Sequence, residues 1–276
     1  MRVLAVVLNW RTPAMTLRAA AACLRALEGI EGAMTVVDND SGDGSEALLR
    51  EGTAGWPRTR VLQSGRNGGF GAGNNHGIRA GLPDGGRPDL VYVLNSDAFP
   101  DPGAVRALAG HLARHPRAGL AGSLIRGEDG VPHLTTFRFP SVASEFEGAA
   151  RLGPVSRLLA ARAVPVPVPA ATCRVDWLAG ASLMMRRDML DRIGLFDEGF
   201  FLYYEETDLC LRAARAGWET HFVRESDVTH IGSASTGMKD WARVPDYWYD
   251  SRLRYFVRNH GPATAAAATA AHVAGG

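Results

Sequence analysis

Residues 91–97 read Val91-Tyr92-Val93-Leu94-Asn95-Ser96-Asp97, an unbroken β-rich apolar run that ends in a polar triplet. Such a run is typical of a strand buried on both faces of a parallel sheet. Asp97 then lies just past the carboxyl end of that strand, where open α/β sheets bind ligands. The stretch therefore predicts a buried central strand and one edge of a binding site.

Strands and helices alternate around this run. Residues 12 and 13, a threonine followed by a proline, are typical of an N-cap and a first helical position. The pattern predicts strands at residues 3–8, 34–37, 61–63 and 90–94, and helices after residue 12 and at 73–81 and 102–115. This rhythm is typical of the α/β class, with a mostly parallel central sheet flanked by helices.

The rhythm breaks near residue 138. Residues 139–169 contain five prolines, which predicts a long excursion over the surface. We expect regular secondary structure to resume at residues 175–186, with a helix at 205–216 and short strands near 221–223 and 227–230. We expect one domain over residues 1–260, followed by an alanine-rich flexible tail at 261–276.

Composition excludes several classes of protein. The chain is 46% hydrophobic and 21% charged with a net charge of +1, which argues against a nucleic-acid binder. Cys23, Cys173 and Cys210 are scattered, which favours buried thiols. No signal peptide and no run of roughly 20 apolar residues is recognised. We therefore expect a cytoplasmic protein with at most peripheral contact at the inner face of the membrane; its oligomeric state stays open.

Polar residues gather at the ends of the first strands. Asn9 ends the first strand, and Asp38 and Asp40 follow the second, where they form either a polar turn or part of a site. The glycine cluster at residues 65–75 precedes a helix and offers free backbone N–H groups to an anion, although a flexible turn explains it too.

Two acidic segments are candidates for chemistry. Asp97 can supply one oxygen to Mg²⁺ or Mn²⁺. Glu205, Glu206 and Asp208 begin a helix, whose dipole alone would stabilise them. Flanking aromatic residues would also bury the segment, and a desolvated carboxylate is a better base. His230, taken alone, is more typical of a packed or surface histidine than of a ligand.

Together these segments resemble the inverting family-2 glycosyltransferases with a GT-A fold, in particular the rhamnosyltransferase-like and galactofuranosyltransferase-like members. The resemblance runs from residue 3 to about residue 260. The matching segments are residues 7–10, 36–41, 67–77, 94–97, 177–181, 194–200 and 204–212.

The resemblance implies a GT-A domain whose residues 1–125 bind the nucleotide sugar and whose residues 126–260 form the acceptor and catalytic half. Asp38 would read the nucleotide base. The full set of implied donor-binding residues is Asn9, Asp38, Asp40, Asn67, Gly69, Asn74, Asn95, Ser96, Asp97 and Gly180.

The resemblance also implies a metal site and a base. Asp97 and His230 would hold Mn²⁺ or Mg²⁺, and Glu206 would be the general base. Glu205 would contact the donor or acceptor sugar, and Asp208 and Trp177 would lie on the acceptor side. The usual Glu-Asp pair is Glu-Glu here, and Asn95 replaces an aspartate found in some members.

The implied reaction moves a sugar, rhamnose or a similar one, from a dTDP or UDP donor to a hydroxyl of a glycan, glycolipid or other glycosylated acceptor. Two alternatives stay open. A nucleotidyltransferase would need a glycine-rich basic loop after the first strand, where residues 9–13 read Asn-Trp-Arg-Thr-Pro. A non-catalytic nucleotide-sugar-binding protein would not require Glu206 and His230.

Overall fold

The computed structural model describes residues 1–150, 153–232 and 242–275. In its first half each strand is followed by a helix that returns the chain for a parallel partner. The elements, in chain order, are β1 (Val3–Asn9), α1 (Pro13–Ala26), β2 (Gly32–Asp38), α2 (Ser45–Gly52), β3 (Thr59–Gln63), α3 (Gly69–Arg79) and β4 (Leu90–Asn95). The strands and helices that were predicted for this half of the chain are confirmed.

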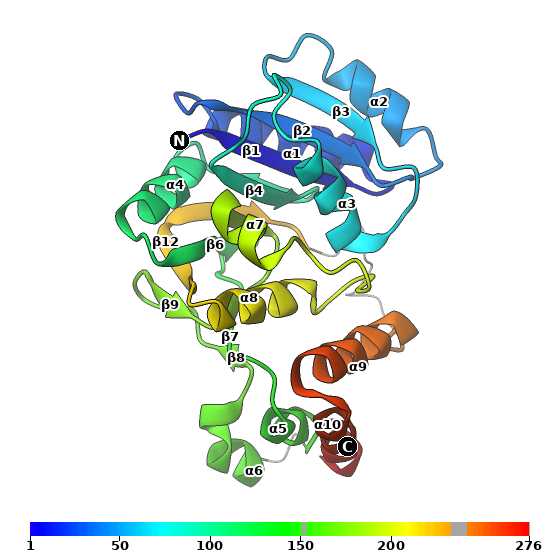
Figure 1. The fold of residues 1–276 in the computed structure, drawn as a ribbon, viewed down its shortest axis with the longest axis vertical. Coiled ribbons are helices and arrows are strands. Elements are labelled where there is room, and N and C mark those ends of the chain that lie inside the picture. Colours follow the sequence, from blue (N-terminus) through cyan, green and yellow to red (C-terminus); the bar gives the residue numbers. More distant parts are fainter. Residues whose placement is uncertain (151–152, 233–241, 276) are drawn as a thin grey trace.

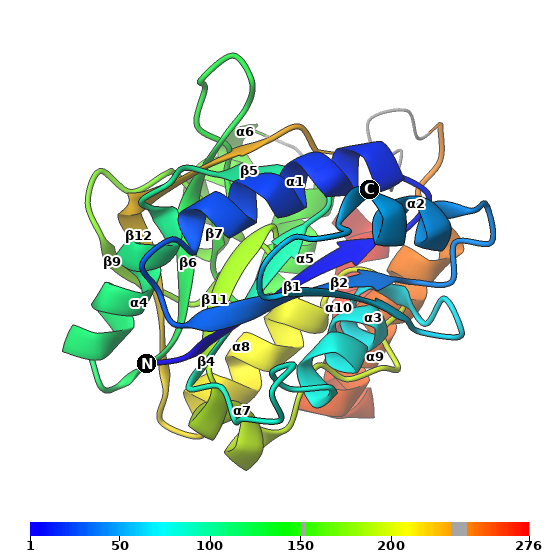
Figure 2. The same ribbon diagram turned by 90° about the horizontal axis from the view of Figure 1, so that it is seen from above.

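The central sheet has the strand order β3-β2-β1-β4-β11-β6-β12-β5, where β11 is Ser182–Arg186, β6 is Ala118–Arg126, β12 is Glu219–His230 and β5 is Ala98–Pro100 (Figures 1 and 2). Strand β9 (Cys173–Val175) adds to β12. Strands β3, β2, β1 and β4 are parallel, whereas β11 runs antiparallel to both of its neighbours. The α/β class with a mostly parallel sheet is confirmed, with the reversal confined to the second half.

The second half starts with a short return strand after Asp97. Its elements are β5 (Ala98–Pro100), α4 (Ala104–Arg114), β6 (Ala118–Arg126), β7 (Thr136–Phe137), α5 (Val142–Ala150), α6 (Gly153–Leu158), the 3₁₀ turn η1 (Ala160–Arg162), β8 (Pro165–Val166), β9 (Cys173–Val175), β10 (Trp177–Leu178), β11 (Ser182–Arg186), α7 (Arg187–Ile193), α8 (Glu205–Arg215), β12 (Glu219–His230), α9 (Asp246–His260) and α10 (Pro262–Gly275).

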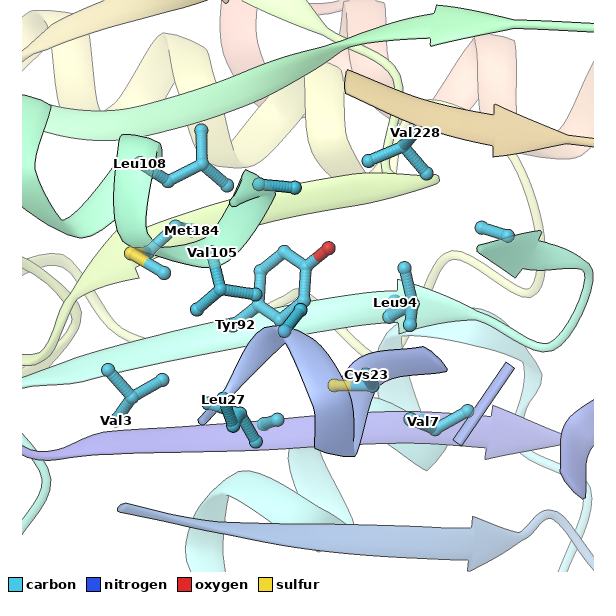
Figure 3. Packing of buried hydrophobic residues seen from close by; sticks show 14 of the residues in the cluster. Val3, Val7, Cys23, Leu27, Tyr92, Leu94, Val105, Leu108, Met184 and Val228 are labelled. Carbon is cyan, nitrogen blue, oxygen red and sulfur yellow. The ribbon is translucent and has the colours of Figure 1, made fainter. Parts of the chain in front are cut away.

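Both faces of the sheet are covered, because its strands are apolar on both sides. On one face, Val3 and Val7 of β1 pack with Tyr92 and Cys23 in a core completed by α1 and α4 (Figure 3). Residues of the same strands that point the other way, such as Leu4, form a second core with α3, α7 and α8. Covering both faces leaves the strand ends as the place where polar side chains can gather.

One expectation for the second half is wrong, and other elements were not predicted. The two short strands near residues 221–230 form one strand, β12, whose register against β6 shifts between Val223 and Asp227. Strand β6 was not predicted, since its alternating small residues carry little β signal. Residues 139–169 hold helices α5 and α6, because their prolines fall largely outside the helices.

The expected flexible tail is also wrong. Residues 262–275 form helix α10, which buries Ala265 and Ala268 against α9 and α5. Alanine has the highest helix propensity, and its small side chain allows the helices to approach closely. Among the described residues, none of the helices combines the length and the apolar character that a bilayer crossing requires.

A histidine cluster joins α4 to the start of β12, at the opposite end of that strand from His230. His111 Nε2 lies 2.8 Å from His221 Nδ1, and the His115 ring stacks on His111 with centroids 4.0 Å apart. His221 Nε2 lies 3.1 Å from Glu219 Oε2. Burial, followed by the charges of His115, His221 and Arg114, lowers the pKa of His111 to about 4.

This cluster predicts a loss of stability in acid. Because the folded pKa of His111 lies below the ordinary value of 6.5, the unfolded chain binds more protons as the pH falls from about 6.5 to about 4. We expect His111→Gln to reduce this acid loss by about 3 kcal/mol at most, measured by urea unfolding at several pH values. His76→Gln, a change on α3 outside the cluster, is the control; an equal effect there would contradict the assignment.

Candidate active site

The strand order brings the predicted polar residues to one edge of the sheet. Asn9 ends β1, Asp38 ends β2 and Asn95 ends β4, and these strands are neighbours in the order β2-β1-β4. His230, the last residue of β12, pairs with Ala98 next to Asp97. Asn9 and His230 therefore reach the same region, although more than 200 positions separate them in the chain.

Asp97 and His230 face each other at this edge. His230 Nε2 lies 3.0 Å from Asp97 Oδ1, and Asn95 Nδ2 lies 3.4 Å from the same nitrogen. Both side chains are largely buried, Asp97 at 4% and His230 at 17% exposure. The Ile231 N–H donates to the Asp97 carbonyl, which fixes the two segments together.

This pair suits a divalent cation. Two cis ligands of an octahedral ion, each at about 2.1 Å, lie about 3.0 Å apart. Carboxylate oxygen and imidazole nitrogen are both accepted by Mn²⁺-type ions. Within the described ranges no third His, Cys, Asp or Glu joins them in a metal-binding group. The remaining ligand positions would therefore fall to oxygens of a bound substrate and to water.

Asn9 and Asp38 are internal rather than exposed. The Asn9 amide donates to Asp38 Oδ1 at 2.7 Å, and the Gln63 amide donates to Asp38 Oδ2 at 2.8 Å. The Ser41 hydroxyl and backbone N–H supply two more hydrogen bonds. Asn9 is 0% and Asp38 is 1% exposed. As the structure stands, this network organises the strand ends, and Asp38 could read a base only by exchanging one of these partners.

Asp40, Ser96 and Asn74 differ in what they offer. Asp40 is exposed in a left-handed turn with φ +56°, and its backbone N–H donates to Gln63. Ser96 is 4% exposed at the pocket described below. Asn74 is fully buried inside α3, where its amide donates to the Phe70 carbonyl. The predicted donor contact of Asn74 stays a prediction; in this conformation its side chain supports the helix.

The glycine cluster docks against the segment before α8. The Phe70 N–H donates to the Phe201 carbonyl at 3.0 Å, and Gly69 has φ +85°. A Cβ at Gly69 would lie 1.8 Å from the Phe201 oxygen, so only glycine fits. The Asn39 amide donates to Asn67 Oδ1 and to the Gly69 carbonyl, which ties the cluster to the end of β2.

A pocket of about 260 Å³ lies between these elements. Of the residues predicted to bind the donor, Asn67, Gly69, Asn95 and Ser96 line it. The aromatic and aliphatic walls of the pocket were not predicted, and only the position of Trp10 at a strand end could have indicated one of them. The other lining residues are Leu8, Trp10, Asn39, Phe70, Phe201, Leu202 and Tyr247.

Glu206 lies beside this pocket, behind Phe70. Glu206 Oε1 accepts the Gly180 N–H at 2.9 Å. A Cβ added at Gly180 would lie 2.7 Å from that oxygen and 3.0 Å from Phe70 Cζ, so Phe70 and Glu206 meet at this glycine. Burial raises the pKa of the half-buried Glu206 carboxyl. A raised pKa makes the carboxylate a stronger base.

Glu205 is more deeply buried than Glu206. Glu205 is 1% exposed, and its Oε2 has no hydrogen-bond partner among the described residues. Its carboxyl accepts the backbone N–H of Tyr203, in a turn where Tyr203 and Tyr204 have φ of +69° and +68°. Burial and then the adjacent Glu206 charge raise the pKa of Glu205 well above its ordinary value. This carboxyl is placed to hold the turn rather than to reach a ligand.

Asp208 and Trp177, predicted to contact the acceptor, do not line the pocket. Asp208 is 0% exposed and accepts hydrogen bonds from Arg212 at 2.7 Å and Asn259 at 2.8 Å, which ties α8 to α9. The predicted acceptor contact of Asp208 stays a prediction; in this conformation its carboxylate makes its hydrogen bonds inside the protein. Trp177 stacks on Phe137 with centroids 4.1 Å apart, and its indole donates to a backbone carbonyl.

The docking of the glycine cluster can be tested at Gly69. Gly69→Ala should destabilise the chain by about 1–3 kcal/mol more than Gly65→Ala, because only the first change drives a methyl group into the Phe201 carbonyl. Gly65 has φ +75° with open space around it, so both variants share the left-handed penalty of about 1–2 kcal/mol. Urea unfolding compares the two, and equal losses would show that the contact is unimportant.

Comparisons with known proteins agree with this arrangement. The family described as "Glycosyltransferase like family 2" matches residues 2–244. The N-acetylglucosaminyl-diphospho-decaprenol L-rhamnosyltransferase of Mycobacterium tuberculosis is 34% identical over 218 residues, which cover 73% of this chain and 67% of that protein.

Solved structures share the fold. GalNAc-T7 with UDP, GalNAc and Mn²⁺ has a TM-score of 0.61 at 15% identity, covering 83% of this chain and 44% of the other. Mannosyltransferase PcManGT from Pyrobaculum calidifontis, in complex with GDP-Man and Mn²⁺, has a TM-score of 0.58 at 13% identity, covering 99% and 74%. On the family match and the sequence identity, this chain belongs to glycosyltransferase family 2 and is a glycosyltransferase with the GT-A fold.

Proposed function

We propose that the chain transfers rhamnose, or a similar sugar, from a dTDP or UDP donor to a hydroxyl of a lipid-linked glycan, with inversion at the anomeric carbon. The rhamnosyl donor is supported by the mycobacterial relative, whose name also contains a polyprenyl-diphosphate acceptor. The observation that carries the proposal is the Asp97–His230 pair at the end of β4, beside a pocket that has the half-buried carboxylate of Glu206 behind it.

Glu206 is the proposed general base. Its carboxylate would accept the proton of the acceptor hydroxyl as that oxygen forms a bond to the anomeric carbon. The bond from this carbon to the diphosphate oxygen breaks on the opposite face, and the electron pair leaves with the diphosphate. The Gly180 N–H orients the carboxylate through its 2.9 Å hydrogen bond. Attack opposite the leaving group accounts for inversion.

The leaving diphosphate needs positive charge beside it. Asp97 and His230 would hold a Mn²⁺ or Mg²⁺ ion, which supplies electrostatic stabilisation of the departing diphosphate when it is bound. The nucleotide would occupy the pocket between Trp10, the glycine cluster and Phe201, where the aromatic walls exclude water. Ser96 and Asn95, at the end of β4, would contact the ribose or diphosphate.

Removal of the base should abolish turnover and spare donor binding. Glu206→Gln keeps the shape and an acceptor for the Gly180 N–H but cannot take a proton, so kcat should fall about 10²–10⁴-fold. The affinity for dTDP, measured by calorimetry, should stay near the native value. In the native protein, activity should fall as the pH is lowered and Glu206 becomes protonated. The fall should begin at a higher pH than for an ordinary glutamate, because burial raises the pKa of Glu206.

The control is Glu51→Gln, at an exposed position on α2. It should leave both measurements unchanged. Retention of most turnover in Glu206→Gln would remove this residue from the reaction and direct attention to Glu205.

The metal pair has its own signature. Asp97→Asn and His230→Gln should each weaken Mn²⁺-dependent dTDP binding by at least about tenfold. Even the loss of a residue that only hydrogen-bonds to a metal ligand typically lowers metal affinity by about that factor. Asp101→Asn, at an exposed position near the same edge, is the control. Titration of dTDP with and without Mn²⁺ measures the effect, and a loss that is equal in both conditions would place the pair outside metal binding.

Product analysis separates the proposed reaction from the two alternatives. A glycosyltransferase releases a nucleoside diphosphate from dTDP-rhamnose in an acceptor-dependent manner. A nucleotidyltransferase would release pyrophosphate from a nucleoside triphosphate instead, and a non-catalytic binding protein would release neither. Chromatography of the nucleotides after incubation with each substrate distinguishes the three.

A further inference from the structure

The two C-terminal helices lie at the end of the molecule away from β3 (Figure 1). They form an uncharged groove. The groove has a volume of about 620 Å³ and lies between α9 and α10. Leu253 and Val257 line it from α9, and Ala266, Ala270 and Val273 line it from α10. Thr269 is the one lining residue with a polar side chain, so the groove offers almost no hydrogen bonds.

The apolar residues of this groove are exposed. Leu253 is 49%, Val257 is 43% and Val273 is 71% exposed. Residues 262–275 contain no Asp, Glu, Lys or Arg, although a surface helix normally presents charged residues to water. A contiguous exposed apolar surface of this kind marks an interaction site.

Helix α9 connects the groove to the active site. Tyr247, in its first turn, lines the pocket. Leu253 and Val257 follow on the same helix, and ten residues of α-helix span about 15 Å. Tyr249, which is 45% exposed, precedes them at the same four-residue spacing, so the three form a row along one face. Two residues of α-helix turn through about 200°, so this row lies on another side of α9 from Tyr247, and a molecule whose head lies at the pocket would pass around the first turn of α9 to extend an apolar chain into the groove.

We propose that this groove binds the polyprenyl chain of the lipid-linked acceptor. The inference rests on the proposed function, because it assumes that the acceptor head group reaches Glu206. A protein partner would be expected to meet a polar rim with hydrogen bonds across it. A hydrocarbon chain needs none, and its burial against Leu253, Val257 and Val273 is favourable in proportion to the apolar area covered.

Acceptor chain length tests the proposal. The same sugar-diphosphate head group is supplied on a decaprenyl chain and on a butyl chain, and kcat/KM is measured for both. Leu253→Asp and Val273→Asp should each reduce kcat/KM for the decaprenyl acceptor by about tenfold or more. Both variants should leave kcat/KM for the butyl acceptor within about twofold of the native value, because Glu206 and the pocket are untouched.

The chain offers a matched control. Leu48 is 50% exposed, close to the 49% of Leu253, and it lies on α2. Helix α2 is at the opposite end of the molecule from α9 and α10 (Figure 1). Leu48→Asp should therefore change neither measurement. Binding of decaprenyl monophosphate, followed by intrinsic tryptophan fluorescence, should weaken by about tenfold or more in Leu253→Asp but not in Leu48→Asp.

The other outcomes overturn the proposal. Equal losses for both acceptors, or no loss for either, would show that the groove does not hold the chain. A dimer in light scattering that Leu253→Asp dissolves, with unchanged acceptor preference, would make the groove an interface between two copies. Failure of the proposed function looks different: the native protein would then transfer no sugar to either acceptor, while the decaprenyl monophosphate binding would still be lost in Leu253→Asp.

Discussion

The active site depends on one contact, the docking of the glycine cluster onto the backbone before α8. The Phe70 N–H donates to the Phe201 carbonyl, and Gly69 is close enough to that oxygen that no side chain fits between them. This contact joins the first half of the sheet, with its parallel strand ends, to the segment that leads into Glu206. Without it the pocket would lose one wall and Phe70 would no longer bring the pocket next to the carboxylate.

Helix α9 holds the same segment from the other side. The Ser251 hydroxyl donates to the Leu202 carbonyl, and the Arg254 guanidinium donates to both oxygens of Asp197. The Tyr247 ring lies 5.6 Å from Phe201. Tyr204, in its left-handed conformation, packs on Tyr255 of the same helix. Two successive left-handed tyrosines are strained, and they persist because packing on both sides determines their position. The C-terminal helices are thus part of the active-site architecture rather than an appendage.

Much of the fold could be predicted from the sequence, because its strands are continuous apolar runs and its helices carry clear starts. Residues 91–97 predict β4 and the turn that carries Asp97, and the acidic helix start predicts α8. The convergence of Asp97 and His230 follows from a pairing of β12 with β5, which no local pattern reports. Burial was the harder quantity to predict. Aspartate and asparagine are common ligand-binding residues. Yet Asp38, Asn74 and Asp208 make their hydrogen bonds to other groups of the protein. Helix α10 was missed because alanine-rich sequence shows no apolar periodicity, although small side chains are what its packing requires.

The Glu-Glu pair also has a physical explanation. Two adjacent carboxyls in a buried place cannot both ionise readily, since like charges raise each other's pKa. Glu205 is the more buried of the two, and burial followed by the Glu206 charge raises its pKa well above the ordinary value, while its carboxyl accepts the Tyr203 N–H and holds that turn. Glu206 reaches the Gly180 N–H at 2.9 Å with the full length of its side chain. An aspartate there would be shorter by one carbon–carbon bond, about 1.5 Å, and could not make this hydrogen bond unless α8 moved toward Gly180. The extra methylene is therefore matched to the position of α8 in this chain.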